Sequence, residues 1–138
     1  MGVLDFLSAG GKSRDASVYG LSCELHPYSL KANANDYLDL EIDLENFTGE
    51  QAKSNEFTSI VVSLARGLGV DRSAISQTRE IRLGQLKAGE KRHLKMQVWA
   101  TQRTEKGTYA CTIKAIQHDR DYSHVKNAAT KRLSIRVD

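Results

Sequence analysis

The sequence is poor in the residues that mark several classes of protein. Its 138 residues include one proline and two cysteines. The longest apolar run after the N-terminal stretch, Ile60 to Ala65, is far too short to cross a bilayer. The first seven residues lack the basic start of a signal peptide and carry Asp5 within their apolar run. We therefore expect a cytoplasmic protein with no membrane span.

The two cysteines give weak support for an oxidising compartment. Cys23 and Cys111 fall at inward positions of two expected strands, where a free cysteine packs as a small apolar side chain. In a cytoplasmic protein such thiols usually stay reduced. Two free thiols are favoured over a disulfide.

Catalytic motifs are also missing from the sequence. There is no nucleophile elbow. The stretch Gly10-Gly11-Lys12-Ser13 lacks the earlier glycine of a phosphate loop, because Phe6 stands at that position. We predict no catalytic residue, no cofactor and no metal. A metal-dependent hydrolase is the least favoured function, because it would need His118 or His124 beside a serine or carboxylate in a cleft.

Charge of one sign is not concentrated anywhere in the chain. The 20 basic and 17 acidic residues give a net charge of +3, whereas a nucleic-acid-binding domain usually shows a concentrated basic patch. A nucleic-acid-binding β-domain with a basic strand face is the alternative function, although alternation with acids favours ion pairs. The residues that would form this face with Tyr122 are Arg79, Arg82, Lys91, Arg92, Lys95, Lys131, Arg132 and Arg136.

Two stretches do show a strong pattern. Leu38 to Glu45 alternates apolar and acidic residues over eight positions, and Arg92 to Val98 alternates with a basic outer face. A period of two predicts strands with one face in a core. We expect these strands to be antiparallel neighbours, with each opposite-charge pair contributing about 0.2–1 kcal/mol. Asp39, Glu41, Asp43 and Glu45 would then face Lys91, His93, Lys95 and Gln97. Successive carboxylates on a strand lie roughly 7 Å apart, so they form a poor calcium site.

The remaining chain predicts an all-β fold. With 40% apolar and 27% charged residues, its length suits one domain. We expect residues 1–17 to be a flexible or short helical segment and residues 18–138 to be a seven-stranded antiparallel immunoglobulin-like β-sandwich with Greek-key connections. The expected strands are residues 18–26, 37–46, 57–65, 80–86, 91–100, 108–118 and 131–137, and Asp71 is expected to cap a short helical turn.

Two short motifs flank the fifth expected strand. Leu86-Lys87-Ala88-Gly89-Glu90-Lys91 precedes it, and Lys106-Gly107-Thr108-Tyr109-Ala110-Cys111-Thr112-Ile113 follows it. Together they resemble the cell-adhesion-related domains of bacteria and archaea, known as CARDB domains, over roughly residues 27–137. The resemblance implies an immunoglobulin-like sandwich that binds or spaces other molecules without catalysis. Gly89 suits a turn with positive φ, and the Tyr109 hydroxyl is expected to bind a neighbouring backbone group, as in a tyrosine corner.

The densest polar cluster lies between the last two expected strands. Its histidines and one aspartate recur every three residues, but in a loop this spacing fixes no metal geometry. Loops gather at one end of a sandwich and carry recognition. We therefore expect a protein-interaction or assembly module whose partner is another protein or itself. The candidate contact residues are His118, Arg120, Asp121, Tyr122 and His124.

Overall fold

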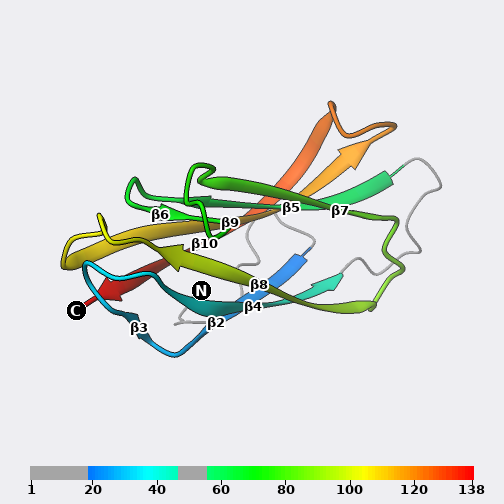
Figure 1. The fold of residues 1–138 in the computed structure, drawn as a ribbon. Coiled ribbons are helices and arrows are strands. Elements are labelled where there is room, and N and C mark those ends of the chain that lie inside the picture. Colours follow the sequence, from blue (N-terminus) through cyan, green and yellow to red (C-terminus); the bar gives the residue numbers. More distant parts are fainter. Residues whose placement is uncertain (1–18, 47–55) are drawn as a thin grey trace, which may run out of the picture.

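The computed structural model describes residues 19–46 and 56–138. These residues form strands and connections arranged as two facing sheets, so the all-β prediction is confirmed (Figure 1). They include no helix that is long and apolar enough to cross a membrane. The expected segment 1–17 lies outside the described residues.

One sheet has the strand order β2-β4-β8-β6. It is built around β4, whose alternating apolar residues Leu38, Leu40, Ile42 and Leu44 are all buried. Every pairing in this sheet is antiparallel. The strands are β2 (Tyr19–His26), β4 (Asp36–Asn46), β8 (Lys91–Ala100) and β6 (Leu68–Gly69).

The other sheet has the order β3-β10-β9-β5-β7. Its strands β5 and β9 turn Ile60, Val62, Ile113 and Ala115 toward the four-stranded sheet, and these side chains are fully buried in the core. The strands are β3 (Ser29–Leu30), β10 (Val125–Val137), β9 (Gly107–Asp119), β5 (Glu56–Leu64) and β7 (Thr78–Gly84).

The strand count differs from the prediction of seven antiparallel strands. The described residues contain nine strands, and β3 pairs with β10 in parallel. The two additional strands, β3 and β6, have two residues each, which is too short for an alternating pattern. Strand β10 begins at Val125 and not at Lys131, because its first half (Asn127 to Thr130) pairs with β9 without large apolar side chains.

The expected pairing of the acidic and basic strands is confirmed residue by residue. In the β4–β8 register, Glu45 lies opposite Lys91, Asp43 opposite His93, Glu41 opposite Lys95 and Asp39 opposite Gln97. His93 places Nδ1 2.7 Å from Asp43 and Nε2 3.0 Å from Glu41. The Nζ of Lys95 lies 3.6 Å from Asp39. These pairs are largely exposed, so each contributes modestly to stability.

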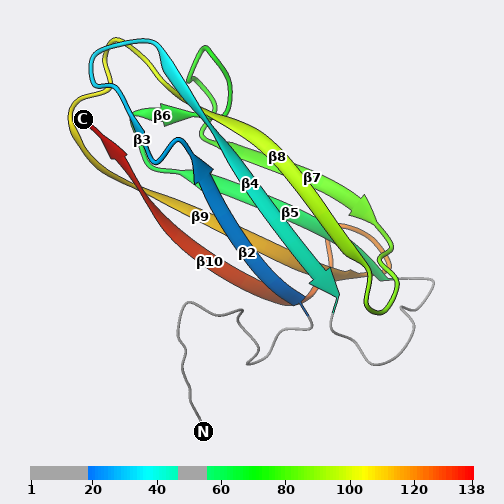
Figure 2. The same ribbon diagram turned by 90° about the horizontal axis from the view of Figure 1, so that it is seen from below.

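The two sides of the sandwich are closed differently. After β2, the chain passes a cis peptide bond between His26 and Pro27 and continues as β3, which joins the other sheet beside β10. Strand β2 also lies against β10 (Figure 2). On the opposite side, β7 is the edge of its sheet, and β6 pairs with β8 at Trp99 and Ala100. Among residues 19–46 and 56–138, no other strand pairs with β7 or β8 on that side, which we call the open side.

Two local predictions from the motifs are confirmed. Gly89 has φ = +77° in the turn before β8. The Tyr109 hydroxyl donates to the carbonyl of Glu105 at 2.7 Å, which is the bond of a tyrosine corner. Cys23 and Cys111 are both free. Burial raises the pKa of Cys23 to about 11 and that of Cys111 to about 12, so both thiols are poor nucleophiles at neutral pH.

Replacing Ile42 by alanine should destabilise the protein strongly. Ile42 is 0% exposed at the centre of β4, so the truncation leaves a cavity and should lower the free energy of unfolding by about 2–5 kcal/mol. The matched control is Ile75→Ala, because Ile75 is 85% exposed and should change stability by less than about 0.5 kcal/mol. Urea denaturation measures both. Equal effects of the two substitutions would contradict this assignment of the core.

Candidate functional site

The connection between β9 and β10 contains most of the predicted contact residues. Asp121 organises this turn by accepting bonds from the backbone N–H of Ser123 at 2.9 Å, from the Ser123 hydroxyl at 2.6 Å and from His124 Nδ1 at 2.8 Å. The Ser123 hydroxyl and then His124 hold the pKa of Asp121 well below its usual range. Arg120, Asp121 and His124 are exposed.

His118 and Tyr122 pack against the outer face of the five-stranded sheet. His118 lies within β9, is only 2% exposed, and places Nε2 2.6 Å from the Ser59 hydroxyl. The Tyr122 ring lies 5.5 Å from the Phe57 ring and 5.1 Å from the His118 ring, centroid to centroid. The Tyr122 hydroxyl accepts a bond from the backbone N–H of Gly84 at 3.0 Å. Of the five predicted contact residues, Arg120, Asp121 and His124 are therefore exposed. His118 and Tyr122 anchor the turn to the sheet.

The contact between Ser59 and His118 has the chemistry of a nucleophile and its base, but a substrate has no access to it. Ser59 is 0% exposed, and the pair lies outside the groove described below. The His118 Nδ1 is buried and makes no hydrogen bond. A catalytic serine must be reachable by the bond that it attacks. Within the described residues, no group of three or more histidine, cysteine, aspartate or glutamate side chains is arranged to hold a metal ion.

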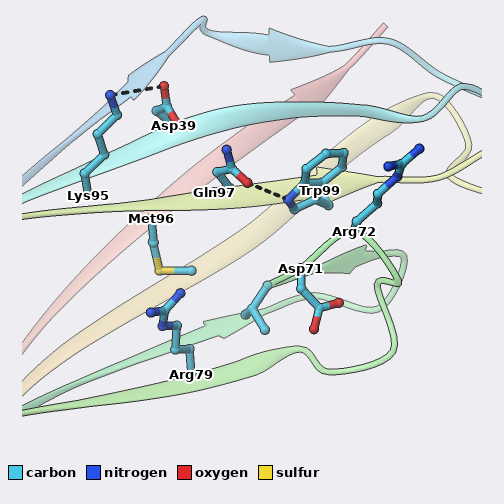
Figure 3. Close-up of a pocket in the computed structure, with 9 residues that line it drawn as sticks. Asp39, Asp71, Arg72, Arg79, Lys95, Met96, Gln97 and Trp99 are labelled. Atoms are coloured by element: carbon cyan, nitrogen blue, oxygen red, sulfur yellow. Dashed lines mark hydrogen bonds and ion pairs between the residues drawn. The ribbon is translucent and has the colours of Figure 1, made fainter.

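A groove of about 520 Å³ lies on the open side of the sandwich, between β7 and β8 (Figure 3). Its volume is typical of ligand sites. It was not predicted from the sequence. Strand β8 contributes Lys95, Met96, Gln97 and Trp99, β4 contributes Asp39, β7 contributes Arg79, and the connection after β6 contributes Val70, Asp71 and Arg72.

The groove carries unpaired positive charge. Asp39 is paired with Lys95. Asp71 accepts bonds from the backbone N–H of Ser73 at 3.0 Å and from its hydroxyl at 2.5 Å, and the hydroxyl bond is the main cause of the lowered pKa of Asp71. Asp71 thus caps a turn, as expected, but no helix follows it. Across the described ranges, Arg72 and Arg79 have no carboxylate within ion-pair distance.

Apolar and aromatic surface lies beside these charges. Met96 is 4% exposed and points from β8 toward Arg79 (Figure 3). Trp99 projects from the other face of β8 with Lys95 and Gln97. Its Nε1 donates to the Gln97 side chain at 3.1 Å, and its ring lies against Tyr37 with the ring centroids 4.7 Å apart and the planes tilted by 31°. Side chains from both faces of β8 therefore line one groove.

No family model and no curated protein sequence matches this chain. The fold has structural neighbours of low sequence identity. Two are structures of β-glucuronidase from Bacteroides uniformis, one of them described as covalently bound to cyclophellitol-6-carboxylate aziridine. They have TM-scores of 0.51 and 0.50 and identities of 15% and 13%. In both, the match covers 84% of this chain and 13% of the enzyme.

A third structure matches over nearly its whole length. The putative ApaA protein from Bordetella pertussis has a TM-score of 0.50 and 8% identity, and the match covers 92% of this chain and 97% of that one. At such identities these likenesses support the fold alone. None of the three is described as a CARDB domain, so that resemblance stays a prediction.

Two histidines should affect the pH dependence of stability in opposite directions. The pKa of His93 is raised, chiefly by its hydrogen bond to Asp43. The contribution of His93 to stability is therefore complete below the unfolded-state pKa of about 6.5. It is lost as the pH rises through the higher pKa of the folded state. The pKa of His118 is lowered, chiefly by burial. The contribution of His118 to stability is present above about pH 6.5, and it is lost as the pH falls through the lower pKa of the folded state.

Chemical denaturation from about pH 5 to pH 8 tests both signs. Relative to the unmodified protein, His93→Gln should lose more stability at the acidic end, and His118→Gln should lose more at the alkaline end. The same pH trend in both variants would contradict the assigned environments.

Proposed function

We propose that this protein is a non-catalytic binding module with an immunoglobulin-like fold, and that it engages another protein through the groove between β7 and β8. The groove carries this proposal, because Arg72 and Arg79 present unpaired guanidinium groups beside Met96 and Trp99. Arginine, tryptophan and methionine are enriched where proteins bind one another. An unpaired charge next to a partly buried aromatic ring gives a partner both affinity and orientation.

The strand order supports the immunoglobulin-like part of the proposal. The order β2-β4-β8 faces β10-β9-β5-β7, and the chain crosses between the sheets from β4 to β5, from β7 to β8 and from β8 to β9. Such crossings are typical of Greek-key sandwiches. The motifs around Gly89 and Tyr109 agree with a CARDB-like domain, whose resemblance implies binding. The free thiols of Cys23 and Cys111 suit a cytoplasmic location.

Nucleic-acid binding is the second candidate, because part of the basic stripe follows the open side. Arg79 and Arg82 lie on β7, and Lys91, Arg92 and Lys95 lie on β8. Most of these charges are already paired, because Glu80 contacts Arg82, Glu90 contacts Arg92 and Asp39 contacts Lys95. The pairing leaves little of the stripe for phosphates, so a protein partner is favoured.

Affinity capture from the native organism should recover a partner that depends on the groove. Arg79→Glu reverses one unpaired charge and should reduce recovery of that partner at least about fivefold. The matched control is Arg132→Glu, because Arg132 is also exposed but lies on β10, which is away from the groove. Mass spectrometry quantifies both captures. Equal recovery with both variants, or turnover of a substrate that is lost in His118→Ala, would defeat the proposal.

The nucleic-acid alternative makes a different prediction. Binding of single- or double-stranded nucleic acid would weaken steeply as salt rises, because phosphate contacts release counterions. Fluorescence polarisation with labelled oligonucleotides at about 20 and 200 mM salt measures this slope. We expect no binding at low salt, and a steep salt-dependent affinity that Arg79→Glu weakens would favour the alternative.

A further inference from the structure

We infer that the groove accepts an extended acidic peptide segment of a partner protein, which adds to the sheet as a strand along β8. This inference rests on the proposed function and specifies the chemistry of the partner. Strand addition combines backbone hydrogen bonds with side-chain pockets on alternate positions. The free edge of β8 meets the first requirement, and the side chains around it, with their charge, meet the second.

The backbone of β8 has an edge that is free to pair. The Asn46 N–H donates to the Glu90 carbonyl at 3.0 Å, in line with the β4–β8 register. Antiparallel strands alternate between residues that bond to the neighbour and residues that point away from it. The backbone groups of His93, Lys95 and Gln97 therefore point away from β4. In the part of the chain that the structure describes, no strand pairs with His93, Lys95 or Gln97 on the side of β8 that faces away from β4.

Strand β6 already uses the end of this edge. Leu68 and Gly69 pair antiparallel with Ala100 and Trp99. The chain then turns away, because the Val70 N–H donates to the carbonyl of Ser76 at 2.9 Å. The sheet thus already pairs with a strand on this edge of β8. The residues of β8 that precede Trp99 remain available on the same edge, and an incoming segment would pair there, in line with β6.

The side chains around the groove match a strand better than a compact ligand. Lys95, Gln97 and Trp99 line the groove from one face of β8, and Met96 lines it from the other. Successive side chains of a strand point to opposite faces, so an added strand would meet both sets. Arg79 lies opposite the buried Val62 in the register of β5 and β7, so it is on the inner face of its sheet. It therefore lines the groove from the same side as Met96.

Charge identifies the partner as acidic. Arg72 and Arg79 have no carboxylate partner among the described residues, whereas His93 and Lys95 already contact carboxylates of β4. Asp71 also lines the groove, but it is one carboxylate beside two arginines. Glutamate or aspartate on the incoming strand would complete the ion pairs of these arginines.

The competing explanation is that these charges only protect the edge. Edge strands often carry lysine or inward-pointing charge that prevents aggregation, and Arg79 fits that description. A purely protective edge would bind no peptide of either charge. Because the sequence has one tryptophan, Trp99, its fluorescence reports directly on the groove.

The probe is an acetylated peptide of repeated valine–glutamate–glutamate units, which carries carboxylates on both faces of a strand. We expect it to change Trp99 fluorescence and to slow hydrogen exchange at the amides of His93, Lys95 and Gln97. Arg79→Glu should weaken its binding at least about fivefold, with Arg132→Glu as the matched control. The same peptide with every backbone nitrogen methylated should not bind, because it keeps the charge but cannot pair with β8.

Three results would overturn strand addition. They are equal binding of the methylated peptide, equal binding of a lysine counterpart, and unchanged exchange at the β8 amides. If a captured protein still depends on Arg79 while these amides remain unprotected, strand addition fails and the proposed binding function stands. If the capture shows no dependence on Arg79 while the peptide protects β8, the edge takes acidic strands but the proposed function fails.

Discussion

The register of β4 is the constraint on which the rest of the structure depends. This strand is central in its sheet, and it buries Leu38, Leu40, Ile42 and Leu44 while their neighbours face water. A shift of one residue relative to β2 or β8 would exchange the two faces and expose that apolar row. The position of β4 therefore fixes its partners on both sides, including which backbone groups of β8 point toward the open side of the sandwich.

The polar face of β4 is arranged with the same regularity. Glu41 lies within 3.1 Å of His26 Nε2 on β2 and within 3.0 Å of His93 Nε2 on β8, so it joins both neighbours of the central strand. Asp39 and Asp43 pair with Lys95 and His93. Acids that would repel one another on an isolated strand become links across the sheet. Of the two carboxylates that line the groove, Asp39 is paired with Lys95, so Arg72 and Arg79 are in excess over Asp71 there.

Sequence periodicity was sufficient for the existence of the seven longer strands, but it missed the two-residue strands β3 and β6 and was insufficient for the site. The β4–β8 pairing follows from alternation, because burial of one face and opposite charges on the other favour these two strands as neighbours. The groove joins Arg72, Arg79 and Trp99, which belong to separate segments. Their proximity depends on two edge strands meeting on one side, which no local pattern encodes. Likewise, nothing in the polar run 118–124 indicates that Tyr122 folds back onto Phe57 and the backbone of Gly84. The one available signal was Trp99 opposite Tyr37 at the end of a basic strand.

The passage of the chain from β2 to β3 has a consequence for assembly. Because β3 crosses to the other sheet and pairs with β10 on the side where β2 lies against β10, the chain itself occupies part of that sheet edge. Among the described residues, the stretch of β8 from His93 to Gln97 has no strand beside it on the side away from β4. A strand from another molecule is therefore expected on the side of β7 and β8.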